Sequence, residues 1–545
     1  MKQSLSRKEP DKQPDKDCME ECHDIAIIGS GVSCAYTLIH YIAGLEQHPP
    51  EKPVRVVVYE KSGEFWNGVP YGSRSGSHSL LISSLKEFLT DKTEREAFAA
   101  WLDKNRDWVF DRFEEGDGKL SAHWLRTNAK AMSGSRWDDL FVPRYTFGLY
   151  MQQRLTALLR RAAKNGILEC NLVAADVVDI RRVKHLHRIQ MVTASGGESS
   201  ALARKVILGI GSPPNSVLRQ SISDCGGKRG CIINDMYAPS MEFNIRRIVE
   251  SLRQSGGQRR QVLIVGTNAS ALEAIYCLNN SVELHGLLGK FLILSCNAEF
   301  PHRIGREAHL ANDLPRHLRH LVKTKARTAR QILDAVRLDV ALAKSRGINV
   351  ADLYGDISKA MIEALNQLSL AEQKKFVAKH GVEIGRMQRR AGADYLDVVD
   401  ALLAEGRIEM LKGKFVRCIP MEGGDLGCEF ATGGRQRRKV IAGPVSVVIS
   451  CAGFQELPSS SSTLIRNLIR RKICTPNASE RGFLINENFE VGRGFHVMGP
   501  LVAGNLTGKV RVWHAESCSR ILAMSKRLAE VLLQHDCVPK QVTET

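Results

Sequence analysis

The sequence predicts an α/β fold of two Rossmann-like units, in which the second unit interrupts the first and carries a helical insertion. Three observations predict it. A short apolar run at 24–28 ends at Gly29 and precedes a helical pattern, which is the strand, turn and helix that open a Rossmann unit. The same order recurs at 261–265, which ends at Gly266. A chain of 545 residues is too long for one compact core, so roughly two or three packed units are expected.

The composition is that of a globular protein without membrane or secretion signals. Hydrophobic residues make up 43% and charged residues 25% of the chain. Residues 1–20 alternate basic and acidic side chains and lack the apolar core of a signal peptide. No apolar run approaches the roughly 20 residues that span a bilayer. The fourteen cysteines include no CxxC pair or metal-ligand spacing, so free thiols, no bound metal and a cytoplasmic location are predicted.

Residues 23–215 form the first part of the first predicted domain. Its strands are short runs of apolar and β-branched residues that end at a glycine, a proline or an acid. These strands lie at 24–28, 54–59, 168–180 and 206–210. Its main helices have apolar residues near a period of 3.6, and they lie at 32–43 and 145–162.

The second predicted domain, 216–455, interrupts the first, which resumes at 456–535. Residues 306–405 have few prolines and frequent Ala, Leu, Lys and Arg, which predicts a helical insertion. The ends of the chain, 1–22 and 536–545, are predicted to be disordered tails. The strands of the second domain are expected at 261–265, 291–295, 408–411 and 445–450, and the resumed first domain supplies a strand at 495–498 and a helix at 515–533.

The turn after the first strand has the chemistry of a pyrophosphate-binding site. Gly29 permits a tight turn, Gly31 lets the backbone approach a pyrophosphate, and the following helix presents free N–H groups to it. Cys34 takes the third glycine position of the usual fingerprint and is small enough for close helix packing. Glu60, at the end of the next strand, is the acid expected at the ribose hydroxyls of a dinucleotide. The other candidate residues of this site are Ser30, Ser33 and Lys61.

Two further motifs resemble those of a known family. Gly68-Val69-Pro70-Tyr71-Gly72 and Phe141-Val142-Pro143-Arg144-Tyr145 are similar to motifs of FAD/NAD(P)-binding proteins related to flavin-dependent urate hydroxylases and, more distantly, to amino-acid N-hydroxylating monooxygenases. The resemblance covers 24–533. It implies that the split first domain binds FAD and that the interrupting domain binds NADPH.

The resemblance also implies positions for several side chains. It places Arg144 near the FAD, where the alternative is a surface ion pair. It brings the loop that begins at Gly499 toward the flavin. The remaining candidate FAD-binding residues are Val177, Gly211 and Leu501.

The second glycine turn departs from the family pattern. Gly266 stands alone where the nicotinamide site of the family shows two glycines, although Ser270 is placed to bond a phosphate. The following strand has no arginine directly after it to hold a 2′-phosphate, and Arg303 is the nearest candidate. NADPH or NADH binding and a purely structural Rossmann domain therefore both remain open.

The reaction in such proteins is mainly that of the cofactor, so few catalytic side chains are expected. His514 follows a tryptophan just after the expected flavin loop, where it either exchanges a proton or packs as a structural residue. We expect an NAD(P)H-dependent monooxygenase that hydroxylates a small polar metabolite, such as an amine, an amino acid or a purine-like molecule. A flavin reductase or oxidase without oxygen insertion is the enzyme alternative.

A basic helical region suggests an alternative of another class. The net charge is +18, and 303–346 contains eleven Lys and Arg against four acids. A solvated helical face accounts for such a segment, and so does binding of an acidic partner such as RNA. The segment has few aromatic residues for base stacking, which disfavours nucleic acid. The sequence does not define the oligomeric state.

Overall fold

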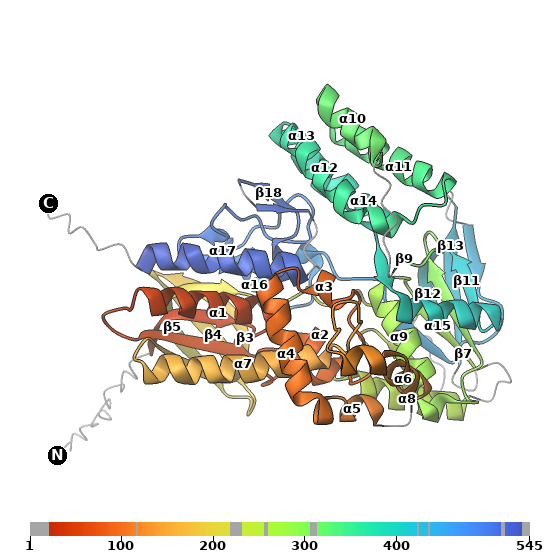
Figure 1. Ribbon diagram of the computed structural model, residues 1–545, viewed down its shortest axis with the longest axis horizontal. Helices are drawn as coiled ribbons and strands as arrows, with labels where there is room; N and C mark the ends of the chain where they lie inside the picture. The colour runs from red at the N-terminus through yellow and green to blue at the C-terminus, as the bar shows by residue number, and fades with distance from the viewer. Residues whose placement is uncertain are drawn as a thin grey trace, which may run out of the picture.

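The computed structural model has the predicted α/β architecture. It describes residues 21–115, 118–218, 231–255, 260–305, 313–421, 425–433, 437–508, 510–513 and 518–536. Two sheets with parallel strands lie in the left and right halves of the molecule, and a group of helices projects at the top (Figure 1). The fold class predicted from the sequence is therefore confirmed.

The first sheet combines strands from both ends of the chain. β1 pairs in parallel with β2 on one side and with β5 on the other, and β2 pairs in parallel with β3. β17 then joins β5 in parallel, with Phe495 opposite Val206. The strands are β1 (Cys22–Ile28), β2 (Val54–Glu60), β3 (Leu168–Val183), β4 (Leu186–Thr193), β5 (Glu198–Leu208), β16 (Glu490–Gly492) and β17 (Phe495–Val497).

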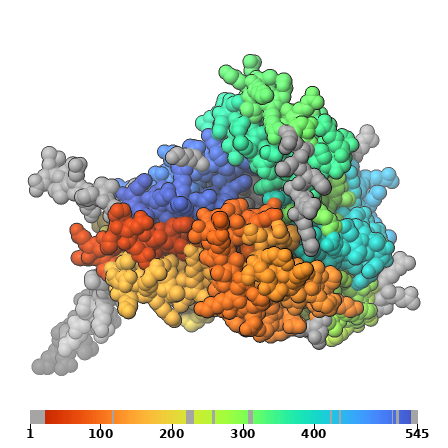
Figure 2. All heavy atoms as spheres, viewed as in Figure 1, coloured from red at the N-terminus to blue at the C-terminus, as the bar shows by residue number. Residues whose placement is uncertain are grey.

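The helices of this part also join the two ends of the chain. α1 (Val32–Gln47) packs along α17 (Cys518–Asp536), and the two segments lie side by side on the surface (Figure 2). Gly44 allows this contact, because a Cβ atom there would lie 2.2 Å from a methyl group of Leu533. The other helices are α2 (Gly68–Tyr71), α3 (Leu85–Phe88), α4 (Lys92–Val109), α5 (Asp111–Glu114), α6 (Lys119–Ser133), α7 (Tyr145–Lys164) and α16 (Thr463–Arg470). No helix in the described ranges is long and apolar enough to cross a membrane.

The second sheet is parallel throughout and lies between the two parts of the first in sequence. Its order is β11, β8, β7, β15 and β6. The strands are β6 (Cys231–Ile233), β7 (Gln261–Val265), β8 (Lys290–Ser295), β11 (Ile408–Lys412) and β15 (Val447–Ser450). Its helices are α8 (Met241–Gln254), α9 (Ala269–Asn280) and α15 (Ala393–Ala404), and two short strands, β9 (His302–Ile304) and β10 (Arg390–Gly392), lead into and out of the helical segment.

An antiparallel sheet of three strands, which the sequence analysis did not predict, packs on the second sheet. It consists of β12 (Lys414–Pro420), β13 (Leu426–Thr432) and β14 (Arg437–Val440). Its inner side chains share an apolar cluster with β7, β8 and β15, which includes Cys418, Cys428 and Phe430. A two-stranded hairpin, β18 (Asn505–Thr507) and β19 (Val510–Val512), follows β17.

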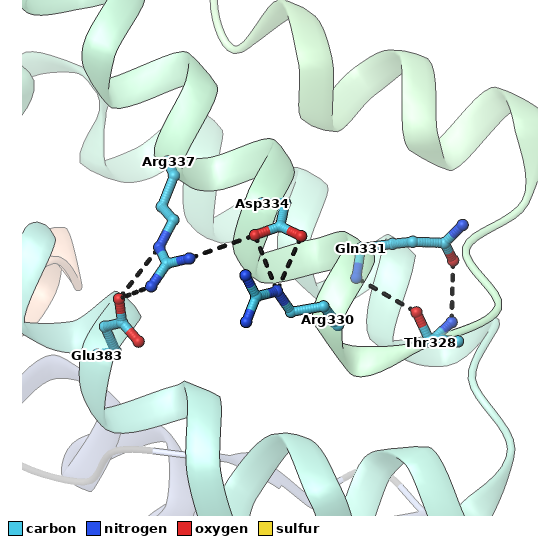
Figure 3. Close-up of polar contacts among 6 residues, drawn as sticks. All are labelled: Thr328, Arg330, Gln331, Asp334, Arg337 and Glu383. Carbon is cyan, nitrogen blue, oxygen red and sulfur yellow. Dashed lines mark hydrogen bonds and ion pairs between the residues drawn. The ribbon is translucent and has the colours of Figure 1, made fainter.

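The projecting helices form a bundle with an apolar cluster of its own. They are α10 (Arg316–Thr324), α11 (Ala329–Ser345), α12 (Tyr354–Asn366), α13 (Leu370–Lys375) and α14 (Gly381–Met387). Thr328 and Gln331 form a capping box that begins α11 (Figure 3). Trp513, which follows β19, belongs to the same cluster, so the bundle contacts the C-terminal part of the chain.

A buried carboxylate joins the two parts of the first sheet region. Asp179 on β3 accepts hydrogen bonds from Arg471, directly after α16, at 2.7 to 3.0 Å, and one from Arg181 at 3.0 Å. Burial raises the pKa of Asp179, but the hydrogen bonds from the two arginines outweigh it and hold the pKa below its usual value.

We expect Asp179→Asn to lower the melting temperature at pH 7 and to have a smaller effect in acid. The ionised carboxylate stabilises the folded state above its unfolded pKa of about 3.9, and this contribution is lost as the pH falls through the lower folded pKa. Loss of hydrogen bonds to a charged group costs roughly 1.5–3 kcal/mol. Melting curves of both proteins between pH 7 and pH 3 test this expectation. A difference in melting temperature that stays constant over this range would contradict it.

Candidate functional site

Two glycines define the backbone turn at the start of α1. Gly29 has φ +88°, and a Cβ atom there would lie 2.7 Å from the carbonyl oxygen of Gly209, so only glycine fits. Gly31 is the N-cap of α1, and its nearest neighbour in the direction of a Cβ atom is the Cα atom of Gly68 at 3.8 Å. The first N–H groups of a helix have no partner within the helix. An anionic group can therefore approach the backbone at Gly31, as a pyrophosphate requires.

Hydrogen bonds fix the carboxylate of Glu60 beside this turn. One oxygen accepts from the backbone N–H of Ser30 at 2.9 Å and from its hydroxyl at 3.0 Å. The other oxygen accepts from the N–H of Ser62 at 3.1 Å and from its hydroxyl at 2.8 Å. The acid is thereby held at the end of β2 with its roughly four acceptor positions occupied, so a ribose hydroxyl would bind it by replacing one of the two serine hydroxyls. Lys61 points elsewhere, because it forms an exposed ion pair with Asp176 at 2.7 Å.

The irregular third position of the turn has a structural explanation. The side chain of Cys34 is fully buried, and its Sγ atom lies 3.9 Å from the carbonyl oxygen of Gly209. A Cβ atom on Gly209 would lie 2.3 Å from that sulfur. In the usual fingerprint, a glycine on the helix provides the space for close packing. Here Gly209, which follows β5, provides that space instead. Close packing of α1 against the sheet is therefore preserved with a cysteine at this position.

We expect Gly209→Ala to destabilise the protein by roughly 1–3 kcal/mol, because the added methyl group overlaps the sulfur of Cys34. Adding Cys34→Gly to Gly209→Ala removes that overlap, so the double variant should regain most of the lost free energy of unfolding. Denaturation midpoints of the two single variants and the double variant give the comparison. If Cys34→Gly lowers the stability of the Gly209→Ala variant further, Gly209 does not serve to make room for the Cys34 sulfur.

The loop after β17 reaches the same turn. Gly499 has φ +73°, and a Cβ atom there would lie 3.2 Å from the hydroxyl of Ser33. Gly499 opens a short 3₁₀ helix in which Leu501 is fully buried. Gly211 follows β5 with φ +78° and nothing within 4 Å of a Cβ position. Val177 lies in the core of β3, opposite Met191 of β4.

Arg144 lies in a buried cluster that joins the first unit to the second. At the N-cap of α7, it forms an ion pair with Glu273 of α9. The hydroxyl of Tyr237 donates to the same carboxylate, and the guanidinium lies 5.4 Å from the Tyr237 ring centre. Burial opposes the charge of Arg144, but Glu273 outweighs this effect and raises the pKa of the guanidinium. The alternative of a surface ion pair is wrong, because both partners are buried.

Two donors of Arg144 are left over in this cluster. Its Nε and Nη2 atoms are buried and have no hydrogen-bond partner among the described residues. Unpaired buried donors are costly, so they suit an acceptor on a bound molecule. Together with the open approach at Gly31 and the fixed acid Glu60, these donors fit a dinucleotide cofactor. Sequence analysis missed Glu273 and Tyr237, although an acid within the apolar stretch of α9 was an available signal.

The second glycine turn repeats the geometry of the first. Gly266 has φ +125°, and a Cβ atom there would lie 2.1 Å from the carbonyl oxygen of Cys451, which follows β15. Gly29 meets Gly209 after β5 in the same way. Ser270 is exposed on the first turn of α9 and can reach a ligand. The second unit therefore retains the strand, turn and helix geometry around a single glycine.

The candidate catalytic residue His514 lies outside the described residues. Its neighbour Trp513 is buried against the helical bundle, and the guanidinium of Arg520 lies 5.3 Å from its ring centre. Arg303, the candidate for a 2′-phosphate, forms ion pairs with Asp397 and Asp400 on α15. Its charge is thus already neutralised by acids of this chain.

Comparison with known proteins identifies the family. A family model described as FAD-NAD(P)-binding matches residues 26–213. The chain is 33% identical over 514 residues to the uncharacterized protein Rv3403c of Mycobacterium tuberculosis, a match that covers 94% of this chain and 95% of that protein. The uncharacterized protein Mb3437c of Mycobacterium bovis matches with the same values of 33% identity, 94% and 95%.

Solved structures show the same fold. The reduced form of ornithine hydroxylase (PvdA) from Pseudomonas aeruginosa has a TM-score of 0.55 at 12% identity and covers 94% of this chain and 99% of its own. DfoA bound to FAD, a cadaverine monooxygenase from Erwinia amylovora, has a TM-score of 0.54 at 11% identity and covers 96% and 97%. The predicted relation to FAD/NAD(P)-binding proteins is confirmed. The chain belongs to the same family as Rv3403c, and its residues 26–213 are an FAD-NAD(P)-binding domain within the fold of flavin-dependent oxidoreductases.

Proposed function

We propose that the protein is an NAD(P)H-dependent FAD monooxygenase that hydroxylates a small polar metabolite. The observation that carries the proposal is the start of α1, where Gly31 leaves the backbone open and Glu60 is held beside it by Ser30 and Ser62. FAD, when bound, supplies the transfer of electrons from NAD(P)H and the reaction with oxygen. The residues of the chain bind it, orient it and exclude water.

The roles of the binding residues follow from their positions. The N-terminal N–H groups of α1 would hold the pyrophosphate, and Glu60 would accept from the ribose. Arg144 would donate to the cofactor through Nε and Nη2 while Glu273 holds its charge. Gly499 would bring the C-terminal loop against the cofactor, because it contacts Ser33 at the start of α1. Gly266 and Ser270 would receive NADPH or NADH in the second unit.

An amine, an amino acid or a purine-like molecule is the proposed substrate class. The names of the two similar structures, an ornithine hydroxylase and a cadaverine monooxygenase, support an amine. His514 is proposed to exchange a proton with the substrate. A cytoplasmic location is proposed as well, and the ten cysteines whose side chains are described, all free thiols, support it.

The ion pairs of the helical bundle argue against binding of an acidic macromolecule. On α11, Arg330 pairs with Asp334, and Arg337 pairs with Asp334 and with Glu383 of α14 (Figure 3). These arginines are therefore neutralised within the bundle, as expected for a solvated helical face. A binding protein for RNA would present them unpaired.

The absorption spectrum of the purified protein tests the proposal. We expect a yellow protein whose flavin absorption band at about 450 nm bleaches when NADPH is added without oxygen. Candidate amines, amino acids and purines are then supplied with oxygen, and NADPH consumption is compared with hydroxylated product. A colourless protein whose melting temperature does not rise with FAD would refute FAD binding. NADPH consumption matched by peroxide with every substrate would instead establish a flavin reductase or oxidase.

A further inference from the structure

Two buried cysteines face each other across the antiparallel sheet of β12 to β14. Cys418 and Cys428 occupy opposite positions on β12 and β13 and are fully buried. Their sulfur atoms lie 3.3 Å apart. Two of the other buried cysteines contact other groups: Cys34 meets a backbone carbonyl and Cys277 meets the hydroxyl of Ser79. This thiol pair has no place in the proposed reaction.

The register of the two strands favours a bond between these sulfurs. The N–H of Met421 donates to the carbonyl oxygen of Asp425 at 2.8 Å, which makes these residues a hydrogen-bonded pair. Pairs alternate along an antiparallel ladder, so Cys418 and Cys428, three positions further from the turn, form a non-hydrogen-bonded pair. The carbonyl oxygen of Cys428 accordingly accepts from Ile441, away from β12, at 2.9 Å.

The geometry of such a pair matches that of a disulfide. Non-hydrogen-bonded pairs have Cα atoms about 4.5 Å apart, within the range of about 4.4–6.8 Å found for disulfides. The sulfurs would need to approach by about 1.3 Å to reach a bond length of about 2.05 Å. On the opposite face of the ladder, Arg417 forms two hydrogen bonds of 3.0 Å with Glu429, which helps to hold this register.

We propose that Cys418 and Cys428 are a modification site that forms a reversible cross-strand disulfide when the protein meets hydrogen peroxide. One thiolate attacks the peroxide, which is reduced and leaves one water and a sulfenic acid. The second sulfur then attacks the sulfenic sulfur and expels another water, so that two thiols and one peroxide give one disulfide and two waters. A dithiol reductant reverses the bond by exchange.

The surroundings of the pair determine its rate of oxidation. The neighbouring thiol and burial raise the pKa of Cys428, which keeps it protonated and slow to react. Cys296 is exposed and serves as an internal comparison. We therefore expect alkylation of the native reduced protein to label Cys296 first and the pair only after unfolding. Oxidation of the pair is expected to be slower than that of Cys296 but to end in a single product.

Mass spectrometry of the full-length protein tests the proposal. The purified protein is incubated with hydrogen peroxide, and the peroxide is removed with catalase. The protein is then unfolded in the presence of N-ethylmaleimide, which labels free thiols, and digested with trypsin. Both cysteines fall in one tryptic peptide, 418–435, which contains no internal Lys or Arg. We expect this peptide to carry no label and to be about 2 Da lighter than the unlabelled reduced peptide, because two hydrogens leave when the disulfide forms. After reduction it should take up two labels. Two retained labels after prolonged exposure that has oxidised Cys296 completely, or a gain of oxygen by the peptide, would overturn the proposal.

Variants separate pairing from general oxidation. In Cys418→Ser, we expect no loss of about 2 Da from peptide 418–435: Cys428 keeps its label or gains oxygen, because no partner thiol is present to expel water from its sulfenic acid. Cys277→Ser is the matched control, since it removes another buried thiol, and peptide 418–435 should still lose both labels. A peptide of Cys418→Ser that is about 2 Da lighter after peroxide would show another reaction and would also overturn the proposal. The measurement on the unsubstituted chain remains decisive if Cys418→Ser does not fold.

Discussion

Gly31→Val is expected to abolish retention of FAD while the protein stays folded. A Cβ atom at Gly31 meets no atom closer than Gly68 Cα at 3.8 Å, so the first added carbon lies in ordinary van der Waals contact. It places a branched side chain where the pyrophosphate would approach the backbone. Charge-assisted hydrogen bonds contribute roughly 1.5–3 kcal/mol each, so loss of one or two weakens binding by about 10-fold to about 10,000-fold. Flavin absorbance per protein and the rise in melting temperature with added FAD measure the loss.

The helix α12 offers a matched control for this change. Gly355 also has nothing near its Cβ position, and Gly355→Ala lies far from the turn in sequence, within the helical bundle. The alanine variant should keep its flavin and gain slightly in stability, since alanine favours a helix by about 1 kcal/mol over glycine. Full flavin content in Gly31→Val would show that the pyrophosphate lies elsewhere.

Arg144→Met is expected to lower the stability of the protein by roughly 3–5 kcal/mol, because it leaves the buried carboxylate of Glu273 without a counter-charge. Glu273→Gln should cost a similar amount by leaving the guanidinium uncompensated. Chemical denaturation of both variants, followed by circular dichroism, measures the change. Free energies of unfolding that equal that of the unchanged protein would show that the buried pair does not stabilise it.

The double variant Arg144→Met/Glu273→Gln separates the ion pair from general damage. It removes both charges, and the glutamine amide oxygen can still accept from Tyr237. We expect it to be more stable than the sum of the single changes predicts, by roughly 0.5–3 kcal/mol. Additive losses would show that the two charges act independently.

The sequence was most informative where backbone conformation depends on one residue. Gly29 and Gly266 were assigned to turns because each ends an apolar strand, and both have positive φ beside the end of a neighbouring strand. The positions of the main parallel strands also followed from apolar runs, because parallel strands are buried on both faces. These features are local, so one segment of chain is enough to reveal them.

Contacts between distant segments could not be predicted in the same way. The partner of Arg144 is Glu273, from a different unit, and no local pattern joins them. Gly209 compensates for Cys34 across the interface between helix and sheet, so its role depends on three-dimensional packing. The sheet β12 to β14 was missed because its strands are short and contain few consecutive apolar residues, and β14 is exposed throughout. His514 and its role as a proton donor remain predictions.

The late arrival of β17 has a consequence for synthesis of the protein. Val206 pairs with Phe495, so β5 waits for a strand that lies about 290 residues further along the chain. At about 5–20 residues per second, a ribosome takes about 15–60 s to deliver it. During that interval the end of β5 at Val206, beyond the part that β4 covers, has no permanent neighbour on one edge, and an open edge can pair with other chains. The yield of folded protein should therefore depend on translation speed between these strands and on chaperones that cover the nascent edge.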